Sequence, residues 1–181
     1  MPIRHPLAAP LERSEALDPA PYIAVPSPGF SHGTWRELSG SCFSGPIRLS
    51  SLQVLERQQD DLVTRYPAGI GTVNIIRLNS SMKRLDQQER ALSEKMVRKF
   101  GSSMRANATI IFGTGFSAAA ARSIMTAQRF VSRAHYPDGT FSALPAAIAW
   151  MVRQLQYSEA DSAAALRFLE MLFEACPPMV P

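Results

Sequence analysis

The clearest pattern of apolar and polar positions lies in the second half of the chain. Residues 108–112 (Ala-Thr-Ile-Ile-Phe) form a short apolar run of β-branched and aromatic side chains, and residues 113–115 (Gly-Thr-Gly) end it. An alanine-rich helical pattern follows from Phe116. Residues 140–143 then alternate as a short strand, and helical spacing returns over residues 144–152. A buried strand joined to its neighbours by helices indicates an α/β fold with residues 108–112 inside the sheet.

The N-terminal part of the chain carries weaker signals. Residues 1–21 are rich in proline, alanine and charge and show no apolar period, so we expect a disordered N-terminal arm. Residues 22–25 are a short strand candidate that Pro26 ends, because proline cannot donate to a sheet ladder. Residues 33–38 are a second, weaker strand candidate. Residues 39–46 are rich in glycine and serine, which predicts a loop.

Helices and strands alternate in the middle of the chain. A helix is predicted from Ser50 or Ser51, where a hydroxyl can cap the free backbone N–H groups, to about residue 66. A strand is predicted over residues 72–78 and a second helix over residues 82–100. Together the segments predict a single mixed sheet of about four to five strands covered by helices. We assign residues 22–156 to this α/β domain and residues 157–181 to an apolar C-terminal helix and tail.

The last predicted helix, over residues 158–176, has a wide apolar face. Polar side chains form one narrow stripe, and apolar side chains occupy most of the remaining circumference. Such a face exceeds what packing on one neighbour usually requires. Three interpretations stay open: the helix lies in a groove of its own domain, forms a dimer contact, or binds another partner. The candidate interface residues are Leu166, Leu169, Leu172 and Phe173.

The composition is that of an ordinary soluble globular protein. Apolar residues make up 46% and charged residues 19% of the 181 residues. No apolar stretch approaches the roughly 20 residues that a membrane helix needs, and the N-terminus shows no signal-peptide pattern. We therefore expect a cytoplasmic protein without a membrane partner, in which Cys42 and Cys176 are free thiols. The net charge of +4 is uneven, with a basic middle and an acidic end.

The turn after residues 108–112 matches the pattern Gly-x-Gly-x-x-Ala over residues 113–118. Between a strand and a helix, this pattern allows backbone N–H groups to hold a phosphate or another anion. The other interpretation is structural, because two glycines also permit a tight turn with positive φ. No acidic residue closes the following strand, as a dinucleotide site requires. The candidate ligand-binding residues of this turn are Gly113, Thr114, Gly115 and Ser117.

Two serines, Ser80 and Ser81, lie between a predicted strand and a predicted helix. Hydroxyl groups at this place most often cap the helix. They are also candidate phospho-acceptors, because a phosphate at a helix N-terminus meets favourable backbone dipoles. Lys83 and Arg84 lie within reach of such a charge.

The chain shows no arrangement typical of an enzyme. His5, His32 and His135 are isolated and lack partners at metal-ligand spacing, and no serine lies in a Gly-x-Ser-x-Gly motif. The basic helix residues are not interleaved with aromatic side chains, so we do not expect a nucleic-acid partner. We expect no catalytic residue, metal or cofactor.

Two stretches resemble the STAS-like domains of anti-sigma-factor antagonists. Residues 108–118 resemble a strand, turn and helix of that family. Residues 140–151 resemble the strand and the aliphatic-Ala-Trp-aliphatic helix that closes many bacterial members. The order of elements over residues 22–155 is similar as well. The resemblance implies a mixed sheet covered by helices, no catalytic centre, and docking onto other proteins, while some relatives also accept lipids or nucleotides.

The resemblance does not extend to the phosphorylated segment of these antagonists. That segment reads Asp-Ser-Ser-Gly in the family, whereas residues 79–82 read Asn-Ser-Ser-Met. We therefore expect a non-enzymatic protein-interaction or regulatory module of the STAS-like type, whose partner is another protein or a second copy of the chain. The alternative is a small-ligand binding protein that uses residues 113–117 to hold an anionic or lipid-like molecule.

Overall fold

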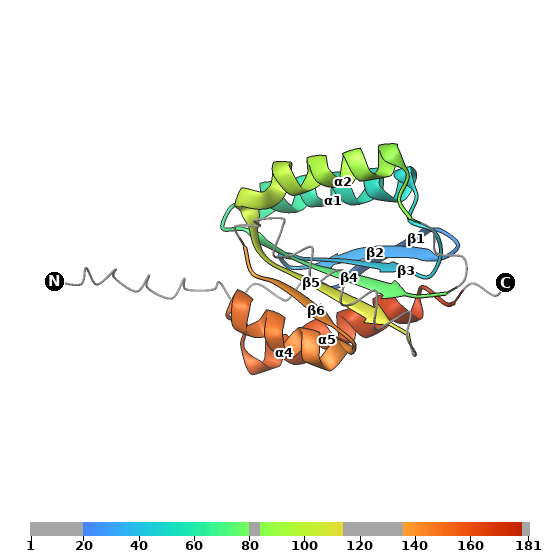
Figure 1. Cartoon of the computed structure of the whole chain (residues 1–181). Helices are drawn as coiled ribbons and strands as arrows, with labels where there is room; N and C mark the ends of the chain where they lie inside the picture. Colours follow the sequence, from blue (N-terminus) through green and yellow to red (C-terminus); the bar gives the residue numbers. More distant parts are fainter. Residues whose placement is uncertain (1–19, 80–83, 114–135, 179–181) are drawn as a thin grey trace.

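A six-stranded mixed sheet forms the centre of the fold (Figure 1). The computed structural model describes residues 20–79, 84–113 and 136–178. β1, β2 and β3 pair antiparallel, and β3, β4, β5 and β6 pair parallel. The prediction of a single mixed sheet is confirmed, although the sheet holds more strands than expected. Neighbours across the sheet follow chain order: β1 (Tyr22–Ser27), β2 (Phe30–Trp35), β3 (Leu38–Phe43), β4 (Ile70–Arg77), β5 (Met104–Phe112) and β6 (Asp138–Phe141).

Helices cover both faces of the sheet, as the sequence predicts (Figure 1). α1 (Leu49–Arg65) and α2 (Gln87–Phe100) lie on one face, and α4 (Leu144–Leu155) and α5 (Glu159–Glu174) lie on the other. A short 3-10 helix, η1 (Gly101–Ser103), joins α2 to β5. α1 links β3 to β4 and α2 links β4 to β5, which is the type of crossover that parallel strands require. The helix predicted from Phe116 lies outside the described residues.

The apolar run at residues 108–112 lies inside the sheet, as predicted. β5 pairs with β4 on one side and with β6 on the other, and Ala108 and Ile110 are fully buried. The strand begins at Met104, earlier than the apolar run suggests. Its first half alternates polar and apolar side chains, and the Asn107 amide donates to Asp138 Oδ1 at 2.8 Å. The hydrogen bond between Asn107 and Asp138 supports the part of β5 that precedes the apolar run at residues 108–112.

The loop predicted over residues 39–46 is wrong, because most of it forms β3. β3 pairs with β2 through a tight turn in which Arg36 has a φ of 49°. Glycine and serine serve here as small strand residues beneath a helix. A Cβ on Gly40 would lie 2.7 Å from Leu172 Cδ2 and 3.0 Å from Phe168 Cζ. Only a residue without a side chain lets α5 lie this close to β3.

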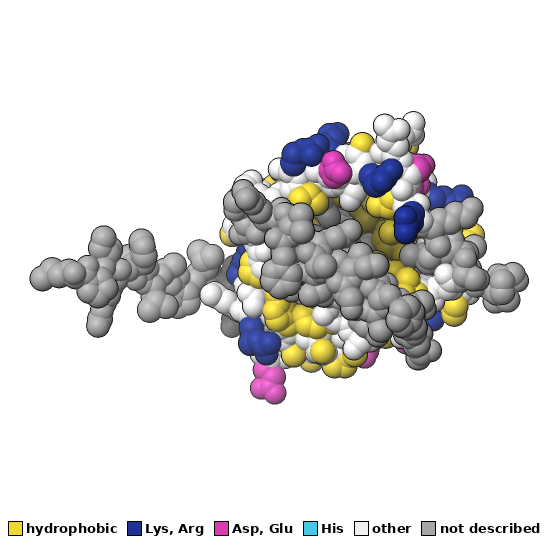
Figure 2. Space-filling view, in the orientation of Figure 1, with side chains coloured by type: hydrophobic (Ala, Val, Ile, Leu, Met, Phe, Trp, Pro, Cys, Tyr) yellow, Lys and Arg dark blue, Asp and Glu magenta, His cyan; other side chains and the backbone are white. Residues whose placement is uncertain are grey.

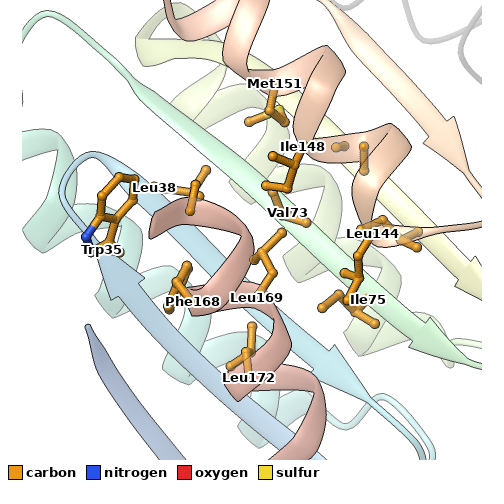
Figure 3. Packing of buried hydrophobic residues seen from close by; sticks show 14 of the residues in the cluster. Trp35, Leu38, Val73, Ile75, Leu144, Ile148, Met151, Phe168, Leu169 and Leu172 are labelled. Atoms are coloured by element: carbon orange, nitrogen blue, oxygen red, sulfur yellow. The ribbon is translucent and has the colours of Figure 1, made fainter. Parts of the chain in front are cut away.

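The main hydrophobic core lies between the sheet and the layer formed by α4 and α5 (Figure 3). Side chains of both helices interdigitate with those of β2, β3, β4 and β5. Each large side chain that is fully buried contributes about 1.5–3 kcal/mol relative to an exposed one. The members labelled in Figure 3 are Trp35, Leu38, Val73, Ile75, Leu144, Ile148, Met151, Phe168, Leu169 and Leu172.

A smaller core lies under α1 and α2 on the opposite face. It contains Phe30, Phe43, Leu52, Leu55, Met96 and Phe100. α2 begins later than predicted, because Asp86 and Glu89 form a capping box that fixes its start at Gln87. α1 begins after Arg48 without a side-chain cap, so the capping role predicted for Ser50 or Ser51 is wrong. Ser51 is instead buried.

Candidate functional site

The structure describes only one residue of the predicted ligand-binding turn. Gly113 is exposed at the carboxyl end of β5 and has a φ of 151°, a value that favours glycine. Thr114, Gly115 and Ser117 lie outside the described residues, and so do the candidate phospho-acceptors Ser80 and Ser81. Ligand binding at this turn and phosphorylation of these serines stay predictions.

The predicted interface on α5 is largely used inside the chain. Leu169 and Leu172 are fully buried against the chain's own sheet, which leaves no surface of theirs for a partner. Leu166 and Phe173 are half-buried and pack on the same core. The structure therefore agrees with the first of the three interpretations, in which the helix packs in a groove of its own domain. The large apolar side chain of α5 that stays exposed is Met171, at 48%.

Polar groups at the carboxyl ends of β3 and β4 fix the end of α5. The Arg77 guanidinium donates to the carbonyl oxygens of Phe173 and Cys176, at 3.3 and 2.8 Å. It also lies 4.0 Å from the centre of the Phe173 ring. The Ser44 hydroxyl donates to the Pro177 carbonyl at 2.6 Å, and the Asn79 amide donates to the Ser44 carbonyl. Carbonyl groups at this helix end are thus satisfied by side chains from other strands.

The two cysteines meet at this end of the sheet, although the sequence places them far apart. Cys42 on β3 and Cys176 after α5 are both buried and free, as the composition predicts. The hydrogen bond between their thiols lowers the pKa of Cys176 to about 6. The same bond, together with burial, raises the pKa of Cys42 above its ordinary value. The two thiols are therefore coupled, and the pair loses its first proton near pH 6.

β1 forms one edge of the sheet and presents apolar side chains to solvent. In the described part of the chain it pairs with β2 alone. Tyr22 and Val25 are 57% and 54% exposed. The strand carries no charged residue (Tyr-Ile-Ala-Val-Pro-Ser), whereas edge strands are commonly protected by charges. A bulge between Ala24 and Ser27, together with Pro26, limits the pairing length of the free edge.

More charged side chains lie over the layer of α1 and α2 than over the layer that contains α4 (Figure 2). Basic side chains lie over α2 in this view, whereas apolar side chains gather over the layer that contains α4. Lys95 and Lys99 of α2 form ion pairs with acidic residues of α1, at 3.0 Å to Glu56 Oε1 and 2.6 Å to Asp60 Oδ2. These two lysines of the basic region are thus paired with the neighbouring helix.

The thiol pair, the polar groups at the end of α5 and the β1 edge could not be predicted in full from the sequence. One signal was present for the β1 edge, because Pro26 within a strand confines that strand to the edge of a sheet. The grouping of Ser44, Arg77 and Cys176 had no signal in the sequence, since three separate segments supply it. Only the packing of α5 across the sheet brings these segments together.

In the described residues, no group of three or more histidine, cysteine, aspartate or glutamate side chains is placed to hold a metal ion. No helix in these same ranges has the length and apolar character needed to cross a membrane. Comparisons of the chain with family models, with curated proteins and with solved structures found no match.

Proposed function

We propose that this chain is a non-enzymatic protein-interaction or regulatory module of the STAS-like type, and that it docks by adding a strand to β1. The occupant to which we commit is the β1 strand of a second copy. The single observation that carries the proposal is the edge strand β1, which pairs with β2 alone among the described residues, carries no charge, and leaves Tyr22 and Val25 more than half exposed. A mixed sheet with helices on both faces supports the STAS-like assignment.

An edge strand recruits another strand because its outward backbone N–H and C=O groups have no partner within the sheet. Two β1 strands related by a two-fold axis pair antiparallel, which buries the same surface on both copies and closes the assembly. Pro26, which cannot donate to a strand ladder, confines this pairing to the part of β1 that ends at Val25. A short strand pair of this kind gives a reversible dimer rather than a growing sheet.

The oligomeric state tests this proposal. We expect the full chain to form a dimer in size-exclusion chromatography with light scattering, with a fraction that rises with concentration. Val25→Lys places a charge on the docking edge and should raise the dissociation constant at least tenfold, about 1.4 kcal/mol. Val97→Lys is the matched control, because Val97 is 47% exposed on α2, away from the sheet edge.

Two outcomes would contradict the proposal. The first is a chain that stays monomeric at every concentration reached. The second is a dimer that Val25→Lys and Val97→Lys weaken equally, because the docking edge would then lie elsewhere. Circular dichroism of both variants checks that each keeps the secondary structure of the parent chain.

A further inference from the structure

An open cleft of about 230 Å³ lies between α1 and the strands β1 and β2. Its walls are mostly polar: His32 and Thr34 come from β2, Tyr22 from β1, and Arg57, Gln58 and Arg65 from α1. The cleft shares Tyr22 with the edge described above, but Val25 does not line it, and the other lining residues come from β2 and α1. It is therefore a separate candidate for ligand binding.

A hydrogen-bond network fixes the orientation of His32 in this cleft. The ring stacks on Phe30, with centroids 5.6 Å apart and an angle of 16° between the planes. The Gln58 Nε2 group donates to the Gly33 carbonyl at 3.0 Å and to Ser39 Oγ at 2.7 Å. Gln58 Oε1 is then left as an acceptor for His32 Nδ1, so Nδ1 carries a proton. Both side chains are 8% exposed.

This network assigns the second ring nitrogen of His32 to the cleft. Nε2 has no hydrogen-bond partner among the residues that the structure describes. A neutral ring accepts a hydrogen bond there, and a protonated ring donates one. The ring does not turn away, because Phe30 and Gln58 hold it. A polar group held ready in this way is suited to contact a ligand.

Two arginines add positive charge to the same cleft. Arg57 and Arg65 are exposed on α1, and neither forms an ion pair within the described ranges. Arg65 Nε donates to the Asp61 carbonyl at 3.3 Å, which leaves its terminal NH2 groups free to bind. Asp61 is the acidic residue among those that line the cleft.

The neighbouring acids of α1 do not cancel this charge. Glu56 and Asp60 lie on the side of the helix toward α2, where Lys95 and Lys99 pair with them. Two guanidinium groups therefore face one carboxylate in the cleft, and the remaining charge favours an anion.

We propose that this cleft binds a small molecule through a phosphate group. Arg57 and Arg65 bind two of its oxygens, and His32 Nε2 forms a hydrogen bond with a third. Three such contacts suit the three oxygens of a phosphate monoester better than the two oxygens of a carboxylate. The volume beyond the phosphate leaves room for the rest of a small ligand beside Tyr22 and Val54.

Titration with phenyl phosphate and with acetate, at constant ionic strength set by chloride, tests this assignment. The full chain labelled with ¹⁵N-histidine is followed by nuclear magnetic resonance. We expect phenyl phosphate to shift the His32 Nε2 resonance saturably and acetate to bind at least tenfold more weakly. Arg57→Gln and Arg65→Gln should each weaken phenyl phosphate binding about tenfold or more. Both residues are exposed, so neither change disturbs the core.

Arg153→Gln on α4 is the matched control, because it removes the same charge from an exposed arginine outside the cleft. Equal weakening by this control would show a general charge effect and would overturn the proposal. Acetate binding as tight as that of phenyl phosphate, or an unshifted His32 resonance, would overturn it as well. Val25→Lys should leave phenyl phosphate binding unchanged, so failure of the dimer and failure of this site are distinguishable.

Discussion

At the scale of single residues, Gly40 sets the distance between α5 and the sheet. The side chains of Phe168 and Leu172 occupy the space that a Cβ on this residue would need. The sequence contains this glycine within a Gly/Ser-rich stretch, which usually indicates a loop. Nothing in the stretch itself says that a helix far along the chain packs on it. For this reason β3 could not be predicted.

Gly40→Ala should destabilise the fold by about 1–3 kcal/mol, because the added methyl group overpacks a core that is already filled. The midpoint and slope of urea unfolding measure this change. Gly101→Ala is the matched control. A Cβ on Gly101 meets nothing within 4 Å, and its φ of −54° suits alanine. We expect that variant to be as stable as the parent chain or about 0.4–1 kcal/mol more stable. Equal stability of both variants would contradict the packing argument.

His32 illustrates a different limit at this scale. The sequence shows an isolated histidine, and isolation predicts a surface or lightly packed side chain. The structure buries it, because Gln58 of α1 and Phe30 of β2 surround the ring. Because Gln58 lies on another element, the pattern of residues around His32 does not predict this contact.

At the scale of elements, the parallel strands share a row of polar side chains on the face toward α1 and α2. The Ser41 hydroxyl donates to Asn74 Oδ1 at 2.9 Å, and the Asn74 amide donates to Asn107 Oδ1 at 3.0 Å. Asn107 also accepts from Thr72 Oγ1 at 2.6 Å and donates to Asp138. Such side chains are unusual in parallel strands, which are mostly apolar on both faces. The row links β3, β4, β5 and β6 side by side.

Asn107→Leu should destabilise the protein by about 1–3 kcal/mol, because it leaves the hydroxyl of Thr72 and the amide of Asn74 without their acceptor. Urea unfolding measures the loss. Gln88→Leu on α2 is the control, since Gln88 is exposed and the change is again from an amide to an apolar side chain. An unchanged free energy of unfolding for Asn107→Leu would contradict this expectation, because water would then replace the lost hydrogen bonds without a loss of stability.

The pattern of α5 predicted the helix well but not its environment. Ser158 and Asp161 form a capping box at its start, and the predicted narrow polar stripe is present. The apolar face of α5 is wide because the helix packs on several strands at once, which the sequence alone does not show. The helix lies across β2 and β3 on one flank, while Phe173 reaches Phe112 on β5, with ring centroids 4.7 Å apart.

At the scale of the whole molecule, the thiol pair makes stability depend on pH. Below the folded pKa of Cys176, about 6, both thiols are protonated in the folded and the unfolded chain. Between this value and the ordinary thiol pKa of about 8.5, the folded pair has lost one proton and the unfolded chain has lost none. The unfolded state then binds more protons, so the free energy of unfolding rises with pH. Above the ordinary value it falls again, because folded Cys42 keeps its proton.

We therefore expect the free energy of unfolding to rise by up to about 1.4 kcal/mol per pH unit between pH 6 and the ordinary thiol pKa. Urea unfolding in reducing buffer at a series of pH values measures this slope. Cys176→Ser should remove it. Parallel pH profiles for the parent chain and Cys176→Ser would show that the pair does not titrate as described.

The fold class, the mixed sheet and the position of residues 108–112 followed from the sequence, because each depends on local periodicity. The order of the strands could not be predicted from the sequence, because the short N-terminal strands could pair in more than one way. The candidate sites were the hardest feature to predict, because Arg57, His32 and Arg77 each contact residues of other elements. Local patterns record which face of an element is buried, but not which element covers it.

The contact between Ser31 of β2 and Leu172 of α5 joins residues that are 141 positions apart. During synthesis, β2 and β3 leave the ribosome long before the helix that shields their apolar side. Trp35, Leu38 and Cys42 stay uncovered until almost all the described chain has emerged. We therefore expect the apolar side of the nascent hairpin to stay accessible to other proteins until α5 packs on it, late in folding.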